Sequence, residues 1–305
     1  MSKQTIIWRI CDGKPGHDNQ SKALVSAFKG LVDCSEVKID AYSLKLGLYN
    51  FLLKKFPPGA GLPTPDIILA AGHNTHLPLL CSKRACGGKT VLLMKPSLPV
   101  SLFDWCIIPS HDRPPDKANI IITKGAPNLL TRSKKLSASN GLILIGGPSK
   151  HFYWNTSQLV SQINEIIRTQ PHISWKIADS RRTPAEFLAR LKPLADEKVM
   201  FVDHETTDSD EFVRLYESAG IVWVTQDSVS MIYEALSCGC QVGLLSMPVK
   251  KTGKISEESC RLIHDRRVTT FDEWHKTGKM HLNEHELNEA MRCAKLLIDG
   301  GILDR

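Results

Sequence analysis

Several absences in the 305-residue sequence narrow the kinds of protein that it can encode. No apolar run approaches the roughly 18–20 residues that a membrane-spanning helix needs. The segment from Met1 to Trp8 is too short and too weakly charged to be a signal peptide, and its composition predicts a strand. We therefore expect a cytoplasmic protein.

Common cofactor and catalytic motifs are also absent. The sequence has neither the Gly-x-Gly-x-x-Gly nor the Gly-x-Ser-x-Gly pattern. It also lacks a Tyr-x-x-x-Lys pair. Without this pair and the glycine-rich cofactor pattern, we do not expect a nucleotide-sugar epimerase. His281 and His285 are four residues apart, but no glutamate or third ligand accompanies them in the order of zinc proteases. Asp208-Ser209-Asp210 has the spacing of a metal-binding Asp-x-Asp motif, yet it lies where we expect a helix cap. We predict no metal site.

The spacing of the cysteines and the distribution of charge give little sign of a metal site or of nucleic-acid binding. The nine cysteines are scattered, and only Cys238-Gly239-Cys240 is tightly spaced, whereas zinc sites need paired clusters. We expect most of them to fill the core. The formal net charge of +7 is not gathered into a basic run, so we expect no nucleic-acid partner. This charge suits an anionic ligand or a membrane surface.

The chain alternates short β-rich runs with amphipathic helical stretches, which is typical of parallel sheets with crossover helices. The polar, non-periodic segment from Thr131 to Asn140 predicts a linker between two such arrays. We therefore predict two Rossmann-like α/β domains, at residues 1–135 and 141–305. Expected strands in the first are Thr5–Ile10, Ile67–Ala71, Thr90–Met94, Trp105–Ile108 and Asn119–Thr123, with a helix from Gln20 to Leu31. Expected strands in the second are Gly141–Ile145, Ser174–Ala178, Lys198–Val202, Ile221–Val224 and Gln241–Leu245. Helices are expected at Thr156–Thr169, at Ser209–Ala219, up to Cys238, and at Glu284–Asp299.

Ligands of open parallel sheets bind outside the carboxyl ends of the strands, so the loops there are the candidate sites. In the second domain a strand ends at Val224, and Asp227 or Ser228 is placed to cap the next helix. A helix N-terminus with free N–H groups is a natural diphosphate site, and Glu234 can accept sugar or ribose hydroxyls. A well-capped scaffold helix explains the segment equally well.

A second loop carries Ser180-Arg181-Arg182-Thr183-Pro184. Thr183 is expected to cap a helix, with Pro184 in its first turn. Two arginines beside a helix N-terminus favour phosphate binding. The alternative is one arginine in a salt bridge and the other in solvent. Gly146 and Gly147 lie in the equivalent loop of the first strand of this domain, where glycines permit close backbone approach to a ligand.

The first domain has an unusually polar, Gly-rich loop from Asp12 to Gln20. Asp12, His17 and Asp18 are candidates for a general base, and we favour His17. A plain turn with Asp18 or Asn19 as helix cap is the alternative. Further candidates from neighbouring loops are His73, His111 and Asp112.

Taken together, these loops resemble those of one family. The motifs are Asp12-Gly13-Lys14-x-Gly16-His17-x-Asn19-Gln20, Pro109-x-His111-Asp112, Gly125-Ala126, Ser180-Arg181-Arg182-Thr183 and Thr225-x-Asp227-Ser228-x-Ser230-Met231-x-x-Glu234-Ala235. In this order, over nearly the whole chain, they resemble the mitochondrial-fission (elongated mitochondria) family and its bacterial relatives. That family is similar to GT-B glycosyltransferases such as the lipid-linked peptidoglycan N-acetylglucosaminyltransferase.

The resemblance implies a GT-B fold, with two parallel sheets facing each other across a cleft that holds a nucleotide-sugar-like ligand. It implies a donor site in the second domain, an acceptor site in the first, no metal or cofactor, and a last helix that packs back on the first domain. The expected donor-site residues are Gly146, Gly147, Ser149, Ser180, Arg181, Arg182, Thr183, Thr225, Asp227, Ser228, Ser230, Met231 and Glu234. The expected acceptor-side residues are Gly13, Gly16, Gln20, His73, Asn74, His111 and Asp112, with Asp12 and His17 as catalytic residues.

Two hypotheses about function follow. The first is a glycosyltransferase that uses a nucleotide-sugar donor and a lipid-linked or lipopolysaccharide-core acceptor. The basic and apolar stretch from Tyr42 to Pro58 suits the surface of the inner membrane, although an ordinary buried helix explains it slightly better. The second is a non-enzymatic adaptor, because plant members of the family recruit a dynamin-like protein to mitochondria. The lack of an extra recruiting segment favours the enzyme.

Overall fold

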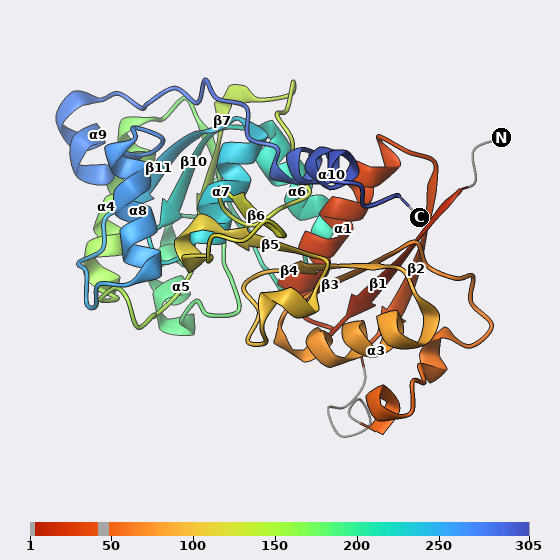
Figure 1. The fold of residues 1–305 in the computed structure, drawn as a ribbon. Coiled ribbons are helices and arrows are strands. Elements are labelled where there is room, and N and C mark those ends of the chain that lie inside the picture. Colours follow the sequence, from red (N-terminus) through yellow and green to blue (C-terminus); the bar gives the residue numbers. More distant parts are fainter. Residues whose placement is uncertain (1–3, 42–48, 305) are drawn as a thin grey trace. The chain divides into compact units, whose positions relative to one another are not determined.

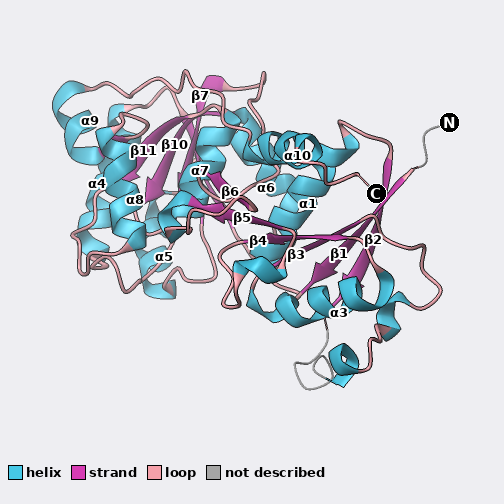
Figure 2. Cartoon of the chain, in the orientation of Figure 1, coloured by secondary structure: helices cyan, strands magenta, loops and turns pink. Residues whose placement is uncertain are grey.

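The computed structural model describes residues 4–41 and 49–304 (Figure 1). The chain forms two compact units, one made of Met1–Leu129 with Asn288–Arg305 and the other of Leu130–Leu287. Each unit is built on a six-stranded parallel sheet with helices on both faces (Figure 2). The predicted α/β fold class is therefore confirmed.

The sheet of the first unit has the strand order β2-β1-β3-β4-β5-β6. Its strands are β1 (Thr5–Cys11), β2 (Cys34–Asp40), β3 (Ile67–Ala71), β4 (Lys89–Leu93), β5 (Trp105–Pro109) and β6 (Ile120–Thr123). Its α-helices are α1 (Pro15–Lys29), α3 (His76–Cys86) and α10 (Glu289–Asp299). The chain runs from β1 outward to β2 and then returns to the other side of β1 as β3, so the strand order reverses between β1 and β3.

Both faces of this sheet are covered, which is why its central strands read as unbroken apolar runs. Alternate residues of β3 point to opposite faces, and all five are buried. Ile67 and Leu69 pack with α1 and α10, whereas Ile68 and Ala70 pack on the face that carries Leu79 of α3. The last helix thus completes the core of the first unit.

The second unit has the strand order β12-β11-β10-β7-β8-β9. Its strands are β7 (Ser137–Leu144), β8 (Ser174–Ala178), β9 (Val199–Val202), β10 (Ala219–Thr225), β11 (Gln241–Leu245) and β12 (Thr269–Thr270). Its α-helices are α4 (Thr156–Thr169), α5 (Ala185–Leu191), α6 (Ser209–Ser218), α7 (Val229–Cys238), α8 (Lys254–His264) and α9 (Phe271–Thr277). Here the order reverses between β7 and β10. Helices α6, α7 and α8 share one core, and α4, α5 and α9 share the other.

Some predicted elements differ from the structure. The expected linker Thr131–Asn140 is wrong at its end, because Ser137–Asn140 opens β7 and pairs with β10 and β8. Helix α1 begins at Pro15, five residues before the predicted Gln20, because a proline is well suited to the first helical position. Helix α10 begins only at Glu289, where the Asn288 side chain accepts a hydrogen bond from the N–H of Met291. The helix cap expected at Asp208-Ser209-Asp210 is confirmed, because Asp208 caps α6.

The stretch predicted at Tyr42–Pro58 falls partly outside the described residues, at 42–48. In the rest of it, residues 49–52 are helical, and Asn50 and Phe56 are buried. Tyr49, Leu52 and Leu53 are exposed by 61%, 69% and 44%, so the buried-helix interpretation holds only in part. Within residues 4–41 and 49–304, no helix combines the length and the apolar character needed to cross a membrane.

The packing of α10 on α1 can be tested with two neighbouring leucines. Leu297 is fully buried in the core shared with α1, so Leu297→Ala should lower the free energy of unfolding by about 2–5 kcal/mol. Leu296 is exposed, and Leu296→Ala should change it by about 0.5 kcal/mol or less. Urea unfolding of both variants measures the difference. Equal losses would show that α10 is not packed in this way.

Candidate functional site

The loops of the second unit meet where its strand order reverses, between β7 and β10. Open α/β sheets bind ligands at such a point, outside the carboxyl ends of the strands. The N–H of Gly146, after β7, donates to Thr225 Oγ1 at the end of β10 (2.8 Å). Two predicted donor loops are therefore in direct contact.

Asp227 organises this point. Its side chain is 0% exposed and forms an ion pair with Arg182, whose Nη2 lies 2.7 Å from Oδ2. The N–H of Gly147 donates to the same oxygen (3.2 Å), and so does the hydroxyl of Ser228 (3.3 Å). Arg182 also donates to Ser228 Oγ (3.0 Å). Asp227 thus joins the loops after β7, β8 and β10.

The two glycines serve this packing. A Cβ on Gly146 would lie 2.3 Å from Ser228 Oγ, and one on Gly147 would lie 2.0 Å from the carbonyl oxygen of Arg182. Their lack of a side chain lets the three loops close on one another. Ser149, further along the loop, accepts hydrogen bonds from the N–H groups of His151 and Phe152 and so shapes its turn.

Thr183 does not cap a helix, which corrects the prediction. Helix α5 begins at Ala185 with Pro184 as its N-cap residue, and no side chain caps it. The hydroxyl of Thr183 instead donates to the carbonyl oxygens of Ile145 and Gly146 (3.0 and 2.7 Å). Ser180 Oγ also donates to Gly146 O (3.1 Å). These bonds fasten the arginine loop to β7.

The two arginines have different surroundings. Arg182 is held by Asp227, and its side chain is 47% exposed. Arg181 is exposed and forms no ion pair or hydrogen bond with the described residues. One arginine is thus in a salt bridge and the other in solvent, which is the alternative that the sequence left open beside phosphate binding. It leaves the Arg181 guanidinium available to an incoming anion.

Helix α7 begins at this point with no side-chain cap. Ser228 is the N-cap residue, as predicted, but its hydroxyl faces Asp227 and Arg182. In the described part of the chain, the N–H groups of Val229, Ser230 and Met231 have no hydrogen-bond acceptor. Unsatisfied N–H groups at a helix N-terminus favour a bound anion. Ser230 is exposed there, while Met231 packs against the core.

Glu234 lies on α7, about one and a half turns from this N-terminus. Its Oε2 accepts a hydrogen bond from the hydroxyl of Tyr216 on α6 (2.8 Å). Burial raises the pKa of Glu234 to about 7, and the bond from Tyr216 opposes the rise. Near neutral pH the carboxyl therefore exists in both protonation states.

In the first unit, the reversal between β1 and β3 brings Asp12, His17 and Gly72 together. The Asp12 side chain is buried, and its Oδ2 lies 3.0 Å from His17 Nδ1. A Cβ on Gly72 would lie 2.2 Å from that nitrogen, so the imidazole rests directly on the loop after β3. Because a carboxylate only accepts, Nδ1 carries a proton, and Nε2 of the neutral ring is left as a base.

The rest of this loop forms the start of α1. Lys14 is the N-cap residue, so the expected cap at Asp18 or Asn19 is wrong. A Cβ on Gly13 or Gly16 would meet no atom within 4 Å, which leaves open space over the loop. Oε1 of Gln20 is buried without a partner among the described residues.

The other acceptor-side candidates lie on neighbouring loops. His73 Nδ1 lies 2.8 Å from Ser97 Oγ, which is 3.3 Å from His76 Nδ1. Burial lowers the pKa of His76 to about 4, with the neighbouring His73 adding to the effect. Ser97 and His76 were not among the predicted residues, and no local sequence signal marks them.

Asn74, in the same turn as His73, is exposed. His111 and Asp112 follow β5, two strands from β3 in the sheet order. The backbone oxygen of Asp112 accepts a bond from Lys95 (3.0 Å).

A second aspartate–histidine pair follows β8 and β9. Asp179 Oδ2 lies 3.0 Å from His204 Nδ1, and Oδ1 accepts the N–H of His204 (2.8 Å). Ligand atoms of Asp179, Asp203 and His204 lie within 4.8 Å of one another, a spacing that suits a metal ion. His204 itself occupies both oxygens of Asp179. That the protein works without a metal or cofactor stays a prediction.

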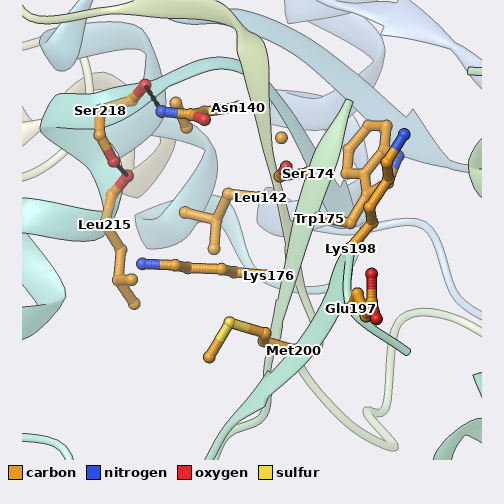
Figure 3. A pocket seen from close by; sticks show the side chains of 12 residues that line it. Asn140, Leu142, Ser174, Trp175, Lys176, Glu197, Lys198, Met200, Leu215 and Ser218 are labelled. Carbon is orange, nitrogen blue, oxygen red and sulfur yellow. Dashed lines mark hydrogen bonds between the residues drawn. The ribbon is translucent and has the colours of Figure 1, made fainter. Parts of the chain in front are cut away.

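A cavity of about 210 Å³ lies elsewhere in this unit, near the amino ends of β8, β9 and β10. Lys176, Met200 and Leu215 line it, and Asn140 donates to Ser218 O at its edge (Figure 3). None of the predicted site residues lines this cavity. It is thus separate from the carboxyl-end loops.

The sequence matches the model of a known protein family. The family model of mitochondrial fission ELM1 matches residues 15–300, which is most of the chain. The chain belongs to the mitochondrial fission ELM1 family. An uncharacterized protein of Rickettsia prowazekii is 26% identical to it, over 95% of this chain and 97% of that protein.

Solved structures share the fold of this ELM1-family chain at low identity. A UDP-N-acetylglucosamine 2-epimerase of Neisseria meningitidis bound to UDP-N-acetylglucosamine is 10% identical, with a TM-score of 0.55 over 97% of this chain and 99% of that chain. MurG of Acinetobacter baumannii is 10% identical, with a TM-score of 0.55 over 97% and 100%. The predicted GT-B type, with two Rossmann-like domains, is confirmed. The missing Tyr-x-x-x-Lys pair excludes only short-chain epimerases, since an epimerase has this fold.

Glu234 predicts a pH dependence of stability in the ELM1-family chain. Its folded pKa of about 7 lies above the ordinary 4.5, so its stabilising proton is fully bound below about pH 4.5 and is lost as the pH rises through 7. Relative to Glu234→Gln, the wild-type free energy of unfolding should fall by about 3 kcal/mol across this range. Urea unfolding of both proteins at a series of pH values measures it. A difference that does not vary with pH would contradict the assignment.

Proposed function

We propose that this protein transfers a sugar from a nucleoside diphosphate sugar to a hydroxyl of an acceptor. The observation that carries the proposal is the uncapped N-terminus of α7 and, in the neighbouring loop, Arg181, which has no ion pair or hydrogen bond among the described residues. Both lie at the strand-order reversal of the second unit. The GT-B fold supports it, because the relative from N. meningitidis with this fold is bound to UDP-N-acetylglucosamine.

The second unit holds the donor in this proposal. The diphosphate accepts hydrogen bonds from the N–H groups of Ser230 and Met231 and from the Arg181 guanidinium. Arg182 stays with Asp227 and keeps the loops in place. Glu234 in its ionised form accepts hydrogen bonds from ribose or sugar hydroxyls. As the bond between the anomeric carbon and the diphosphate oxygen breaks, these donors stabilise the negative charge that develops on that oxygen.

The first unit supplies the base. His17 Nε2 takes the proton of the acceptor hydroxyl while the hydroxyl oxygen bonds to the anomeric carbon. The buried Asp12 carboxylate holds the imidazole in the required tautomer and stabilises the imidazolium that forms. The products are the glycosylated acceptor, the free nucleoside diphosphate and one proton on His17.

The acceptor in our proposal is a lipid-linked or lipopolysaccharide-core sugar, which the protein meets as a peripheral protein at the inner membrane. The exposed apolar side chains of Tyr49, Leu52 and Leu53 on the first unit support this location. A lipid-linked acceptor keeps its anchor in the bilayer, so only the sugar hydroxyl has to reach His17.

Donor binding can be tested by calorimetric titration with UDP, GDP, ADP, TDP and CMP, with and without magnesium. One nucleotide should bind selectively, and Arg181→Ala should weaken it by about 1.5–3 kcal/mol for the charged hydrogen bond lost. The matched control is Arg168→Ala, which removes a basic side chain from the last turn of α4. If none of the nucleotides binds the folded protein, the adaptor hypothesis gains support.

Turnover can be tested separately from binding. The wild-type protein, incubated with sugar nucleotides of the base that binds and with a membrane lipid extract, should release nucleoside diphosphate. His17→Gln should lower that rate by about 10²–10⁴-fold while leaving nucleotide affinity unchanged. An unchanged rate in this variant would exclude His17 as the base.

A second candidate function is epimerisation of a UDP-sugar, favoured by the whole-chain likeness to the N. meningitidis epimerase. An epimerase changes the sugar without an acceptor and leaves the sugar nucleotide intact. Nuclear magnetic resonance of the donor after incubation without lipid distinguishes the two reactions. The adaptor hypothesis predicts neither product.

A further inference from the structure

The segment from Tyr49 to Lys55 presents apolar side chains to solvent on the first unit. Leu52 is 69% exposed and Tyr49 61%, which makes them the two most exposed large apolar side chains of the unit among the described residues. Leu53 lies beside them. A cluster of exposed large apolar side chains on a folded protein marks an interaction site.

This segment is held firmly, so its exposure is a property of the fold. Phe56 is buried and stacks on Trp8 of β1, with ring centroids 5.8 Å apart. The guanidinium of Arg84 on α3 lies 4.9 Å from the ring centroid of Phe51. The N–H of Lys55 donates to the carbonyl oxygen of Asn50 (2.9 Å), and Asn50 is buried. Residues on either side of Leu52 and Leu53 therefore anchor them to the sheet and to α3.

The charged side chains of this segment, and the arginine that lies over its Phe51 ring, have one sign. Lys54, Lys55 and Arg84 are all exposed. The sequence contains no acidic residue between Asp40 and Asp66. A basic rim around an exposed apolar tip complements a surface that offers anionic groups above an apolar interior, and an anionic lipid bilayer has this composition.

We propose that residues 49–55 dock the first unit on an anionic lipid surface. Tyr49, Leu52 and Leu53 enter the boundary between headgroups and acyl chains, and Lys54, Lys55 and Arg84 contact the lipid phosphates. The docking itself does not need sugar transfer. That it brings His17 to a membrane-borne acceptor rests on the proposed function.

Flotation of the full chain with lipid vesicles tests the docking. The protein should float with vesicles of phosphatidylcholine and phosphatidylglycerol at low salt, and little with phosphatidylcholine alone. Lys54→Gln with Lys55→Gln should lower binding about fivefold for each lysine, which corresponds to about 1 kcal/mol per basic residue at an anionic surface. Leu52→Ser with Leu53→Ser should lower it about tenfold or more.

A matched control removes the same side-chain types elsewhere. Met200 is 58% exposed and Lys176 is exposed on the sheet of the second unit, so Met200→Ser with Lys176→Gln should float like the wild type. Wild-type protein that stays unbound, or patch variants that float as well as the wild type, would overturn the proposal. A change in oligomeric state of the patch variants without vesicle binding would also overturn it, in favour of contact between two copies.

Calorimetric nucleotide binding by the patch variants should match the wild type, so failure here is separable from failure of the donor site.

Discussion

The buried carboxylate of Asp227 is the group on which the loops of the second unit depend. A buried charge without partners is strongly destabilising, so its partners must stay in place. They come from three loops: Arg182 after β8, the N–H of Gly147 after β7, and Ser228 beside it. This one requirement explains why Arg182 turns inward and why neither glycine has room for a side chain. It also explains why Ser228 leaves the N-terminus of α7 uncapped.

The first unit meets a similar constraint with different chemistry. Its parallel strands are buried on both faces, so polar groups gather at the strand ends. A buried aspartate next to the strand-order reversal again orients a basic side chain, here His17 over Gly72. One aspartate fixes an arginine within a set of loops, and the other leaves an imidazole nitrogen free. The first arrangement suits binding of an anion, and the second suits transfer of a proton.

Elements that are apolar and regular could be predicted from the sequence. The bounds of β3, α4, β8 and β11 agree residue for residue, because each is an apolar or amphipathic run between polar loops. Strand β2 was missed because Cys34–Asp40, at the edge of its sheet, is half polar. The different surroundings of Arg181 and Arg182 could not be predicted, since the partner of Arg182 lies on a distant loop. The exposure of Leu52 could not be predicted either, because an apolar segment has the same sequence pattern whether it packs in the core or faces solvent.

Hydrogen exchange with and without the nucleoside diphosphate that binds best shows whether the strand-order reversal of the second unit is a diphosphate site. If it is, exchange should slow in peptides that cover residues 146–151, 180–184 and 225–231. Exchange should not change around Lys176 and Met200, which line the separate cavity. Unchanged exchange in those three loops at saturating nucleotide, with protection elsewhere, would contradict this assignment.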